Sequence, residues 1–305
     1  DAMKKTHLIH PAPRRPRNGL SLLLGAALLV APLALAACGG GGGGGGGTAR
    51  SGRAVTMKGS DTMVILGQRW AEVYMQTHPG KAVQVTGGGS GTGIAALING
   101  TTTICQASRP MKDTEKKQLE EKSGAPVEEH PVAMDGITVY VHEGNPITQL
   151  TKAQLKGIYT GQVTNWREIG GGDAPIVVYG RENSSGTYVF FKEHVLENSD
   201  FAPNVQTLPG TSAVADAVGK DPNGIGYGGY AYGGSVKHVP VAADANSPAV
   251  APNEANVRDG SYPLARNLYW YTRANPPAEA KALLEWVLSD AGQAVVKEVG
   301  YFPLR

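Results

Sequence analysis

Cysteine is nearly absent from this chain, and its scarcity excludes several kinds of chemistry. The 305 residues contain two cysteines, Cys38 and Cys105, and seven histidines. We expect Cys38 to be modified as described below, which leaves Cys105 without a partner for an internal disulfide. The residues around Cys105 are largely apolar, so we expect a small buried hydrophobic residue rather than a nucleophile. No spacing of cysteine and histidine fits a structural metal site, so the sequence predicts no bound metal.

Complete motifs for nucleotide binding or covalent catalysis are also lacking. Gly91–Ala96 fits the G-x-G-x-x-A fingerprint of dinucleotide sites, but Asp113, near the spacing of a ribose contact, lies in a polar loop. Ser90 lacks the second glycine of a nucleophile elbow, and no lysine completes a P-loop. His142 begins a zinc-protease motif whose second histidine is replaced by Pro146. We therefore expect a protein that binds a ligand and is not an enzyme, with no cofactor.

The charge balance offers no basic face for a nucleic acid. The chain has 28 Lys and Arg against 26 Asp and Glu, and five of the basic residues and one acidic residue lie within residues 1–37. The rest of the chain therefore carries 23 basic against 25 acidic side chains. A nucleic-acid-binding surface needs concentrated positive charge, so we expect no nucleic acid partner. If the ligand is an anion, local groups must attract it.

Residues 1–37 have the pattern of a secretory signal peptide. A basic beginning is followed by an apolar stretch, Leu20–Ala37, that ends in small residues directly before Cys38. This ending resembles a bacterial lipobox, so we expect cleavage to leave Cys38 as the lipid-carrying first residue. A transmembrane anchor is the alternative, but the stretch is barely long enough and Pro32 interrupts it. We expect an exported protein, tethered by lipid in the periplasm or on the outer face of the cell membrane.

A glycine run separates the expected lipid anchor from the folded part. Gly39–Gly47 is uninterrupted glycine, which cannot pack a core and behaves as a flexible tether. We therefore assign residues 38–53 to the lipidated cysteine and its tether. The remaining residues, from about 54 to 305, are enough for two modest domains or one large one.

Strand and helix patterns alternate along the rest of the chain. The expected strands cover 54–58, 82–86, 103–107, 137–141, 176–179 and 268–271, and the expected helices cover 63–77, 92–99, 114–123, 151–159, 187–196 and 278–288. Such alternation predicts an α/β fold with a mostly parallel sheet. The glycine-rich segment 224–234 is expected to form a loop and a short strand.

Three strand-to-helix junctions are rich in glycine and hydroxyl side chains. They are Gly59–Met63, Gly87–Ile94 and Arg181–Thr187. The free N–H groups at a helix N-terminus, together with nearby hydroxyls, suit a tetrahedral oxyanion, and Arg181 adds a planar fork of donors. An ordinary capped helix is the alternative at any one junction. Because ligands bind beyond the carboxyl ends of strands in open α/β sheets, we expect the three junctions to converge on one small oxyanion.

Five short motifs occur in a characteristic order: GSDTM, GGGSGTGI, ASRPM, MDGI and RENSSGTYVFF. With them the chain resembles the phosphate-binding proteins of bacterial phosphate ABC transporters, from Val55 to the C-terminus. The resemblance implies a type II periplasmic-binding-protein fold, in which two lobes with mostly parallel sheets and flanking helices enclose a ligand cleft. It implies that residues 54–143 plus 263–305 form lobe one and residues 144–262 form lobe two. The crossings between the lobes are expected near His142–Pro146 and Ser261–Leu264.

The resemblance also implies which residues contact the phosphate. The positions that match the family motifs are Ser60, Thr62, Met63, Ser90, Gly91, Arg181, Ser185, Gly186 and Thr187. Some family members carry an aspartate in the third motif, where this chain has Arg109. We expect Asp135 to replace that hydrogen-bond acceptor, although a turn role before Gly136 is the alternative. Arg109 is expected to be a second cationic contact or, alternatively, to hold an acidic residue in place.

The implied function is high-affinity binding of inorganic phosphate and its delivery, by a monomer, to the membrane permease subunits of an ABC importer. Phosphate keeps at least one proton at neutral pH, which a buried carboxylate can accept, whereas sulfate has none. An unpaired buried polar group costs about 1–3 kcal/mol, so the carboxylate rejects sulfate by mismatch. The alternatives are a receptor for another tetrahedral oxyanion such as sulfate, a phosphate-ester hydrolase, and a surface adhesion protein on the same fold.

Overall fold

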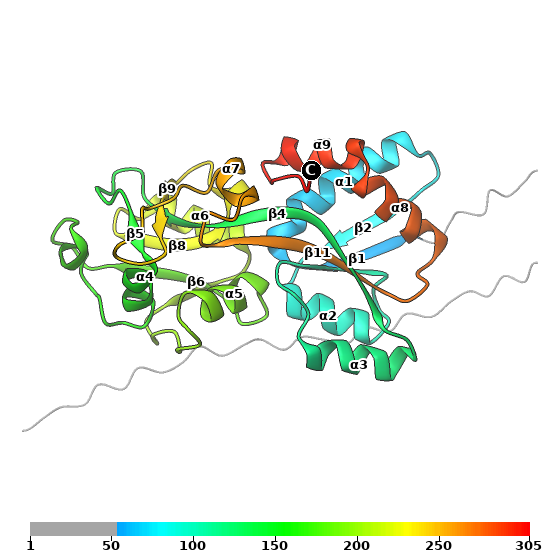
Figure 1. Cartoon of the computed structure of the whole chain (residues 1–305), viewed down its shortest axis with the longest axis horizontal. Coiled ribbons are helices and arrows are strands. Elements are labelled where there is room, and N and C mark those ends of the chain that lie inside the picture. Colours follow the sequence, from blue (N-terminus) through cyan, green and yellow to red (C-terminus); the bar gives the residue numbers. More distant parts are fainter. Residues whose placement is uncertain (1–53) are drawn as a thin grey trace, which may run out of the picture. The chain divides into compact units, whose positions relative to one another are not determined.

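The computed structural model describes residues 54–305 (Figure 1), so the expected signal peptide, Cys38 and the glycine run lie outside the described residues. The strands are β1 (Val55–Gly59), β2 (Val83–Thr86), β3 (Ile104–Ala107), β4 (Val127–Val141), β5 (Leu150–Thr151), β6 (Val177–Arg181), β7 (Gln206–Leu208), β8 (Gly224–Gly229), β9 (Lys237–Val239), β10 (Val241–Ala242) and β11 (Ala265–Arg273). The helices are α1 (Val64–Thr77), α2 (Ser90–Ile98), α3 (Asp113–Ser123), α4 (Lys152–Tyr159), α5 (Gly186–His194), α6 (Thr211–Lys220), α7 (Glu254–Arg258), α8 (Ala278–Leu288) and α9 (Asp290–Val299), with 3-10 turns η1 (Asp61–Met63), η2 (Trp166–Ile169) and η3 (Tyr230–Tyr232). The alternation of strands and helices agrees with the predicted α/β class.

Two parallel blocks of strands are joined by antiparallel strands within one nine-stranded sheet. In the first block β1 pairs in parallel with β2 and β3, and in the second block β6 pairs in parallel with β7 and β8. Between the blocks, β11 is antiparallel to β3 and β4, and β4 is antiparallel to β8. The expected parallel arrangement therefore holds within each block, but the sheet is mixed because the chain leaves the first block along β4 and returns along β11.

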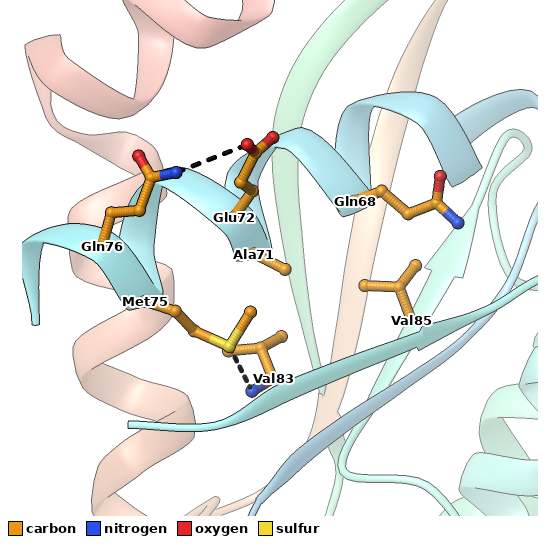
Figure 2. Close-up of a pocket in the computed structure, with 7 residues that line it drawn as sticks. All are labelled: Gln68, Ala71, Glu72, Met75, Gln76, Val83 and Val85. Carbon is orange, nitrogen blue, oxygen red and sulfur yellow. Dashed lines mark hydrogen bonds between the residues drawn. The ribbon is translucent and has the colours of Figure 1, made fainter. Parts of the chain in front are cut away.

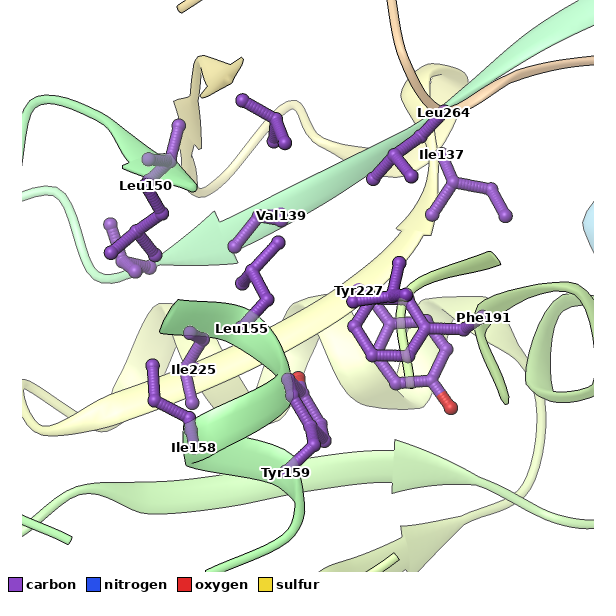
Figure 3. Packing of buried hydrophobic residues seen from close by; sticks show 14 of the residues in the cluster. Ile137, Val139, Leu150, Leu155, Ile158, Tyr159, Phe191, Ile225, Tyr227 and Leu264 are labelled. Atoms are coloured by element: carbon purple, nitrogen blue, oxygen red, sulfur yellow. The ribbon is translucent and has the colours of Figure 1, made fainter. Parts of the chain in front are cut away.

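Each block has its own buried core, and we call the parts built around them lobe one, which contains β1–β3, and lobe two, which contains β6–β8. Val132 of β4 and Leu268 of β11 pack in the core of lobe one. Ile137 of β4 and Leu264, just before β11, pack in the core of lobe two, as Figure 3 shows for the side chains around Phe191. The strands β4 and β11 thus pass from one core to the other, side by side (Figure 1).

The first crossing lies inside β4, earlier in the chain than the expected His142–Pro146. The strand is continuous from Val127 to Val141, and its partner changes from β11 to β8 between Gly136 and Ile137. Residues 137–141, which we expected in lobe one, therefore belong to the sheet and core of lobe two. Gly136 marks the change of partner, where a Cβ atom would lie 3.1 Å from Val257 Cγ2.

Several elements lack a clear sequence signal. The first half of β4 contains Glu128, Glu129, His130 and Pro131, which indicate a loop, yet it pairs with β11. Helices α6 and α9 were not expected either, although Ser289 caps the start of α9 by accepting a hydrogen bond from Gly292 N–H. Across residues 54–305, no helix has both the length and the apolar character needed to span a bilayer.

Candidate functional site

The structure brings the three hydroxyl-rich junctions together where the lobes meet. Thr62, in the turn after β1, and Thr187, in the first turn of α5, have their Oγ1 atoms 2.8 Å apart. Gly91, in the first turn of α2, donates its N–H to the carbonyl of Ser184 at 2.9 Å. The first and second junctions come from lobe one and the third from lobe two. The predicted convergence of the junctions on one place is therefore present in the fold.

A small network of buried serines completes the lobe-one side. Ser60 Oγ donates to Ser108 Oγ at 2.9 Å, and Ser90 Oγ lies 3.3 Å from the same oxygen. The backbone N–H of Ser108 donates to Ser90 Oγ at 3.0 Å. All three serines are at most 1% exposed. Ser108 was not among the expected residues, although it stands next to Arg109 in the ASRPM motif.

Glycine allows the two lobes to approach this closely. A Cβ atom on Gly186, the first residue of α5, would lie 2.4 Å from Ser90 Oγ and 2.7 Å from Ser108 Oγ. Gly89 adopts a φ of +91°, which L side chains rarely adopt, and a Cβ there would lie 2.5 Å from the carbonyl oxygen of Ser184. Ser185 precedes Gly186 and caps α5, because its Oγ accepts the N–H groups of Thr187 and Tyr188.

Arg181 ends β6, and its guanidinium lies almost fully buried in this interface. One terminal nitrogen donates to Thr211 Oγ1 at 2.8 Å, and the other donates to Asp61 Oδ2 at 2.9 Å across the lobes. Glu182 accepts a third contact at 3.0 Å. Burial tends to raise the pKa of Glu182, but hydrogen bonding to Arg181 outweighs it, so that pKa is lowered. Two carboxylates therefore face this one arginine.

Asp61 links the junctions and was missed by the sequence reasoning, although it is the middle residue of GSDTM. Its Oδ1 accepts the N–H of Gly88 at 2.7 Å while its Oδ2 accepts Arg181. Its backbone carbonyl accepts the hydroxyl of Tyr232 at 2.7 Å. A single acidic residue of lobe one thus holds the glycine loop before α2 and two side chains of lobe two.

Asp135 is fully buried on β4 and paired with an arginine that the sequence did not single out. Arg266 on β11 lies opposite Asp135 in the strand register and donates to Asp135 Oδ2 through Nε at 3.1 Å and a terminal nitrogen at 2.8 Å. Asp135 Oδ1 accepts the N–H of Tyr230 at 3.2 Å. The carboxylate is therefore not a turn cap for Gly136, because its partners come from β11 and from η3. Only the fold makes this pairing visible, since 131 residues separate the two positions.

The terminal N–H groups of Arg109 donate to Glu115 and to Pro110 and not to the serine network. The distances are 2.8 and 2.7 Å to the two carboxylate oxygens of Glu115 and 2.8 Å to the carbonyl of Pro110. Burial opposes ionisation of Glu115, but the hydrogen bonds from Arg109 prevail and lower the pKa of Glu115. The structure thus shows Arg109 holding an acid at the start of α3, as the alternative interpretation supposes, and does not place it as a second cationic contact.

The backbone donors expected from the first two junctions have partners within the protein. Met63 N–H donates to the carbonyl of Ser60 at 3.0 Å, and Gly91 N–H donates to Ser184. Tyr301, near the C-terminus, donates its hydroxyl to the carbonyl of Thr62. These bonds fix the backbone of both turns, so their side-chain hydroxyls are held in place at the interface.

The pocket between α1 and β2 suits an anion less well than this interface. It is lined by Ala71, Met75, Val83 and Val85 with glutamine and Glu72 at its rim (Figure 2), and its lining includes no cation. In the part of the chain that the structure describes, no group of acidic, histidine or cysteine residues is arranged to hold a metal ion. Cys105 is buried and free, and burial raises the pKa of its thiol, which agrees with the expected hydrophobic role.

Comparisons with known proteins agree on one kind of molecule. A family model described as a PBP superfamily domain matches residues 45–291. The phosphate-binding protein PstS of Pseudomonas aeruginosa is 40% identical over 264 residues, which cover 81% of each chain. PstS of Staphylococcus epidermidis is 33% identical over 289 residues, which cover 92% of this chain and 87% of that one. A solved phosphate ABC transporter substrate-binding protein from Clostridium perfringens, with bound phosphate, is 32% identical with a TM-score of 0.76, covering 83% of this chain and 100% of that chain.

Proposed function

This chain belongs to the phosphate-binding protein family of the PBP superfamily, and on that basis we propose that it binds inorganic phosphate outside the cytoplasmic membrane for an ABC-type importer. The family consists of binding proteins rather than enzymes. One observation carries the proposal: Thr62 and Thr187, from different lobes, meet at 2.8 Å, and the buried guanidinium of Arg181 crosses the same interface to Asp61, the residue before Thr62.

Phosphate would be held by donors from both lobes. The proposed contacts are the expected Ser60, Thr62, Met63, Ser90, Gly91, Arg181, Ser185, Gly186 and Thr187, together with Ser108 from the serine network. The N–H groups of Met63 and Gly91 would exchange their bonds to the carbonyls of Ser60 and Ser184 for bonds to phosphate. Hydrogen bonds from hydroxyls and N–H groups to an anion are shorter and roughly twice as strong as neutral ones. Exchanging the bond between Thr62 and Thr187 for bonds to phosphate oxygens would therefore favour the bound state.

Net positive charge does not explain the attraction. Arg181 faces Asp61 and Glu182, and Arg266 faces Asp135, so the two cations of the interface are matched by acids. The ligand is instead attracted by the dipoles of oriented hydroxyls and by the N-termini of α2 and α5. A tetrahedral oxyanion fits these donors better than a planar or extended anion.

Asp135 supplies the selectivity for phosphate over sulfate. Its buried carboxylate accepts N–H groups from Arg266 and Tyr230, so it serves as an acceptor in this site. A protonated phosphate oxygen can donate to it, whereas sulfate would oppose one acceptor with another. The alternative ligand, sulfate, is disfavoured by this one acidic residue.

Binding would be read by the transporter as closure of the lobes. A ligand held from both sides stabilises the closed arrangement through contacts that an open one cannot make. We propose that the permease subunits recognise that arrangement. We further propose that the protein acts as a monomer held at the membrane by lipid on Cys38, with residues 1–37 removed and residues 38–53 serving as the tether.

Calorimetric titration of the purified protein, stripped of bound anion, tests the proposal. We expect one-to-one binding of phosphate near neutral pH and little response to sulfate. Preference for sulfate, or no binding of either anion, would contradict the proposed ligand.

Asp135→Asn tests the acceptor in the same experiment. We expect weaker phosphate binding and a phosphate-to-sulfate ratio lowered by about tenfold, because the amide can donate to sulfate and the mismatch of about 1–3 kcal/mol is relieved. Asp113→Asn, on the outer surface at the start of α3, is the matched control and should change neither affinity. An unaltered ratio in Asp135→Asn would remove Asp135 from the acceptor role.

A further inference from the structure

Arg266 contacts three separate segments of the site from a single buried position. It lies on β11 where that strand passes between the lobes, and its side chain is 3% exposed. One terminal nitrogen donates to the carbonyl of Ser108 at 2.8 Å. The other donates to Asp135 Oδ2 at 2.8 Å and to Thr187 Oγ1 at 3.0 Å. Nothing in the strand pattern of β11 distinguishes this residue from its neighbours, so the contacts are a consequence of the fold.

The direction of these hydrogen bonds is fixed by chemistry, because a guanidinium only donates. When Thr187 Oγ1 accepts an N–H from Arg266, one of its lone pairs is used and its own hydroxyl proton can point to a third partner. Thr62 Oγ1, at 2.8 Å, is such a partner in this structure. Asp135 likewise receives two N–H groups and remains an acceptor. Arg266 thus occupies one lone pair of Thr187, leaving its hydroxyl proton available to a third partner, and keeps Asp135 an acceptor.

We propose that Arg266 is a positioning residue that sets the hydrogen-bond polarity of the phosphate site through Thr187 and Asp135. The inference rests on the proposed function and extends it. It assigns the selection of a protonated oxyanion to Asp135 and Arg266, which lie opposite each other on the two strands that pass between the lobes. An anion with one proton satisfies a donor at Thr187 and an acceptor at Asp135 together. A fully deprotonated tetrahedral anion can accept from Thr187 but has no proton to donate to Asp135.

Lysine cannot reproduce this arrangement. Its ammonium is a compact point charge without the planar fork that allows arginine to reach a carboxylate and a hydroxyl in fixed directions. Arg266→Lys therefore keeps a positive charge beside Asp135 but loses the geometry. Arg273 is a matched control on the same strand, because its guanidinium donates to the carbonyls of Leu97 and Ile98, away from the junctions.

A double-mutant cycle with Thr187→Val, measured by calorimetric titration with phosphate and with sulfate, tests the proposal. We expect Arg266→Lys to weaken phosphate binding about tenfold in the wild-type background and less than about threefold with Thr187→Val, because coupled residues are non-additive. We expect the phosphate-to-sulfate ratio to fall about tenfold in Arg266→Lys, because Asp135 is no longer held in the direction that opposes an unprotonated oxygen. Arg273→Lys should leave affinity and ratio unchanged.

The outcomes separate this inference from the proposed function. If Arg266→Lys lowers phosphate affinity equally with and without Thr187→Val and leaves the phosphate-to-sulfate ratio unchanged, its role is purely structural and the inference is overturned. Phosphate binding by the wild type would still support the proposed function. If the wild type binds no phosphate, both fail. Should Arg266→Lys not fold in thermal unfolding, Arg266→Gln, which retains an amide donor without the charge, takes its place in the cycle with the same expected coupling.

Discussion

Arg109 lies just after β3 and Arg181 ends β6, and both have guanidinium groups held by carboxylates. The partner of Arg109 is Glu115, six residues further along in the same lobe, whereas one partner of Arg181 is Asp61, 120 residues away in the other lobe. Both arginines are buried, but only the second pair joins the two lobes. An ion pair within one lobe stabilises that lobe, and a pair between lobes depends on their closure. The two sites should therefore respond differently to mutation.

Arg181→Ala should produce the largest effect. It removes the cation from the interface and leaves Asp61 and Glu182 unpaired, and truncating one member of a buried charge pair costs about 2–5 kcal/mol. We expect phosphate binding to be nearly abolished in calorimetric titration, while the fold stays intact and the midpoint of thermal unfolding falls because two acids have lost their partner. Unchanged affinity would show that Arg181 is not a ligand.

Gly186→Ala tests whether the lobes must approach as closely as the structure shows. The added Cβ would lie 2.4 Å from Ser90 Oγ, and overpacking of this kind costs about 1–3 kcal/mol. We expect phosphate affinity to fall by that amount while the Arg109 pair, which does not depend on closure, is unaffected. Gly172→Ala, at an exposed position with open space around it, is the control and should bind as the wild type does. Equal binding by both variants would mean that this contact is not needed.

Arg109→Ala should lower stability more than phosphate binding, the reverse of what we expect for Arg181→Ala. Its loss leaves Glu115 partly buried without its partner, and a hydrogen bond to a charged group contributes about 1.5–3 kcal/mol. We expect a lower midpoint of thermal unfolding and phosphate affinity close to that of the wild type. A large loss of affinity with normal stability would restore Arg109 as a ligand and contradict the comparison.

Acid should weaken the pair of Arg109 and Glu115 only at low pH, because the pKa of Glu115 is lowered. The pKa of Glu115 is lowered in the folded state, so its contribution to stability is complete above its unfolded pKa of about 4.3 and is lost as the pH falls through the lower folded pKa. Glu115→Gln should flatten the acid limb of the unfolding free energy by about 1 kcal/mol or less, because the carboxylate is partly exposed. Denaturant unfolding between pH 6 and about 3 measures this, and an unchanged acid limb would contradict it.

Local pattern predicted a large part of the fold. The glycine- and hydroxyl-rich junctions stood out because helix caps and positive-φ glycines leave short-range signals, and the helices 63–77 and 278–288 were placed to within about a residue. The first half of β4 was missed because Glu128 and Pro131 indicate a loop, and pairing with β11 overrode that local preference. The crossing inside β4 was misplaced for the same reason, since a continuous strand shows no break where it changes lobes.

The features of the site also divide into those predicted from the sequence and those visible only in the tertiary structure. Sequence alone determined the α/β class, the resemblance to the phosphate-binding family and the hydroxyl-bearing turns, because each depends on residues close together in the chain. Only the tertiary structure decided which charges meet: Arg266 with Asp135 and Thr187, Asp61 with Arg181, and Arg109 with Glu115 instead of with the serines. Ion pairs and interface hydroxyls depend on distances of about 3 Å between distant segments, and strand register and lobe contact set those distances.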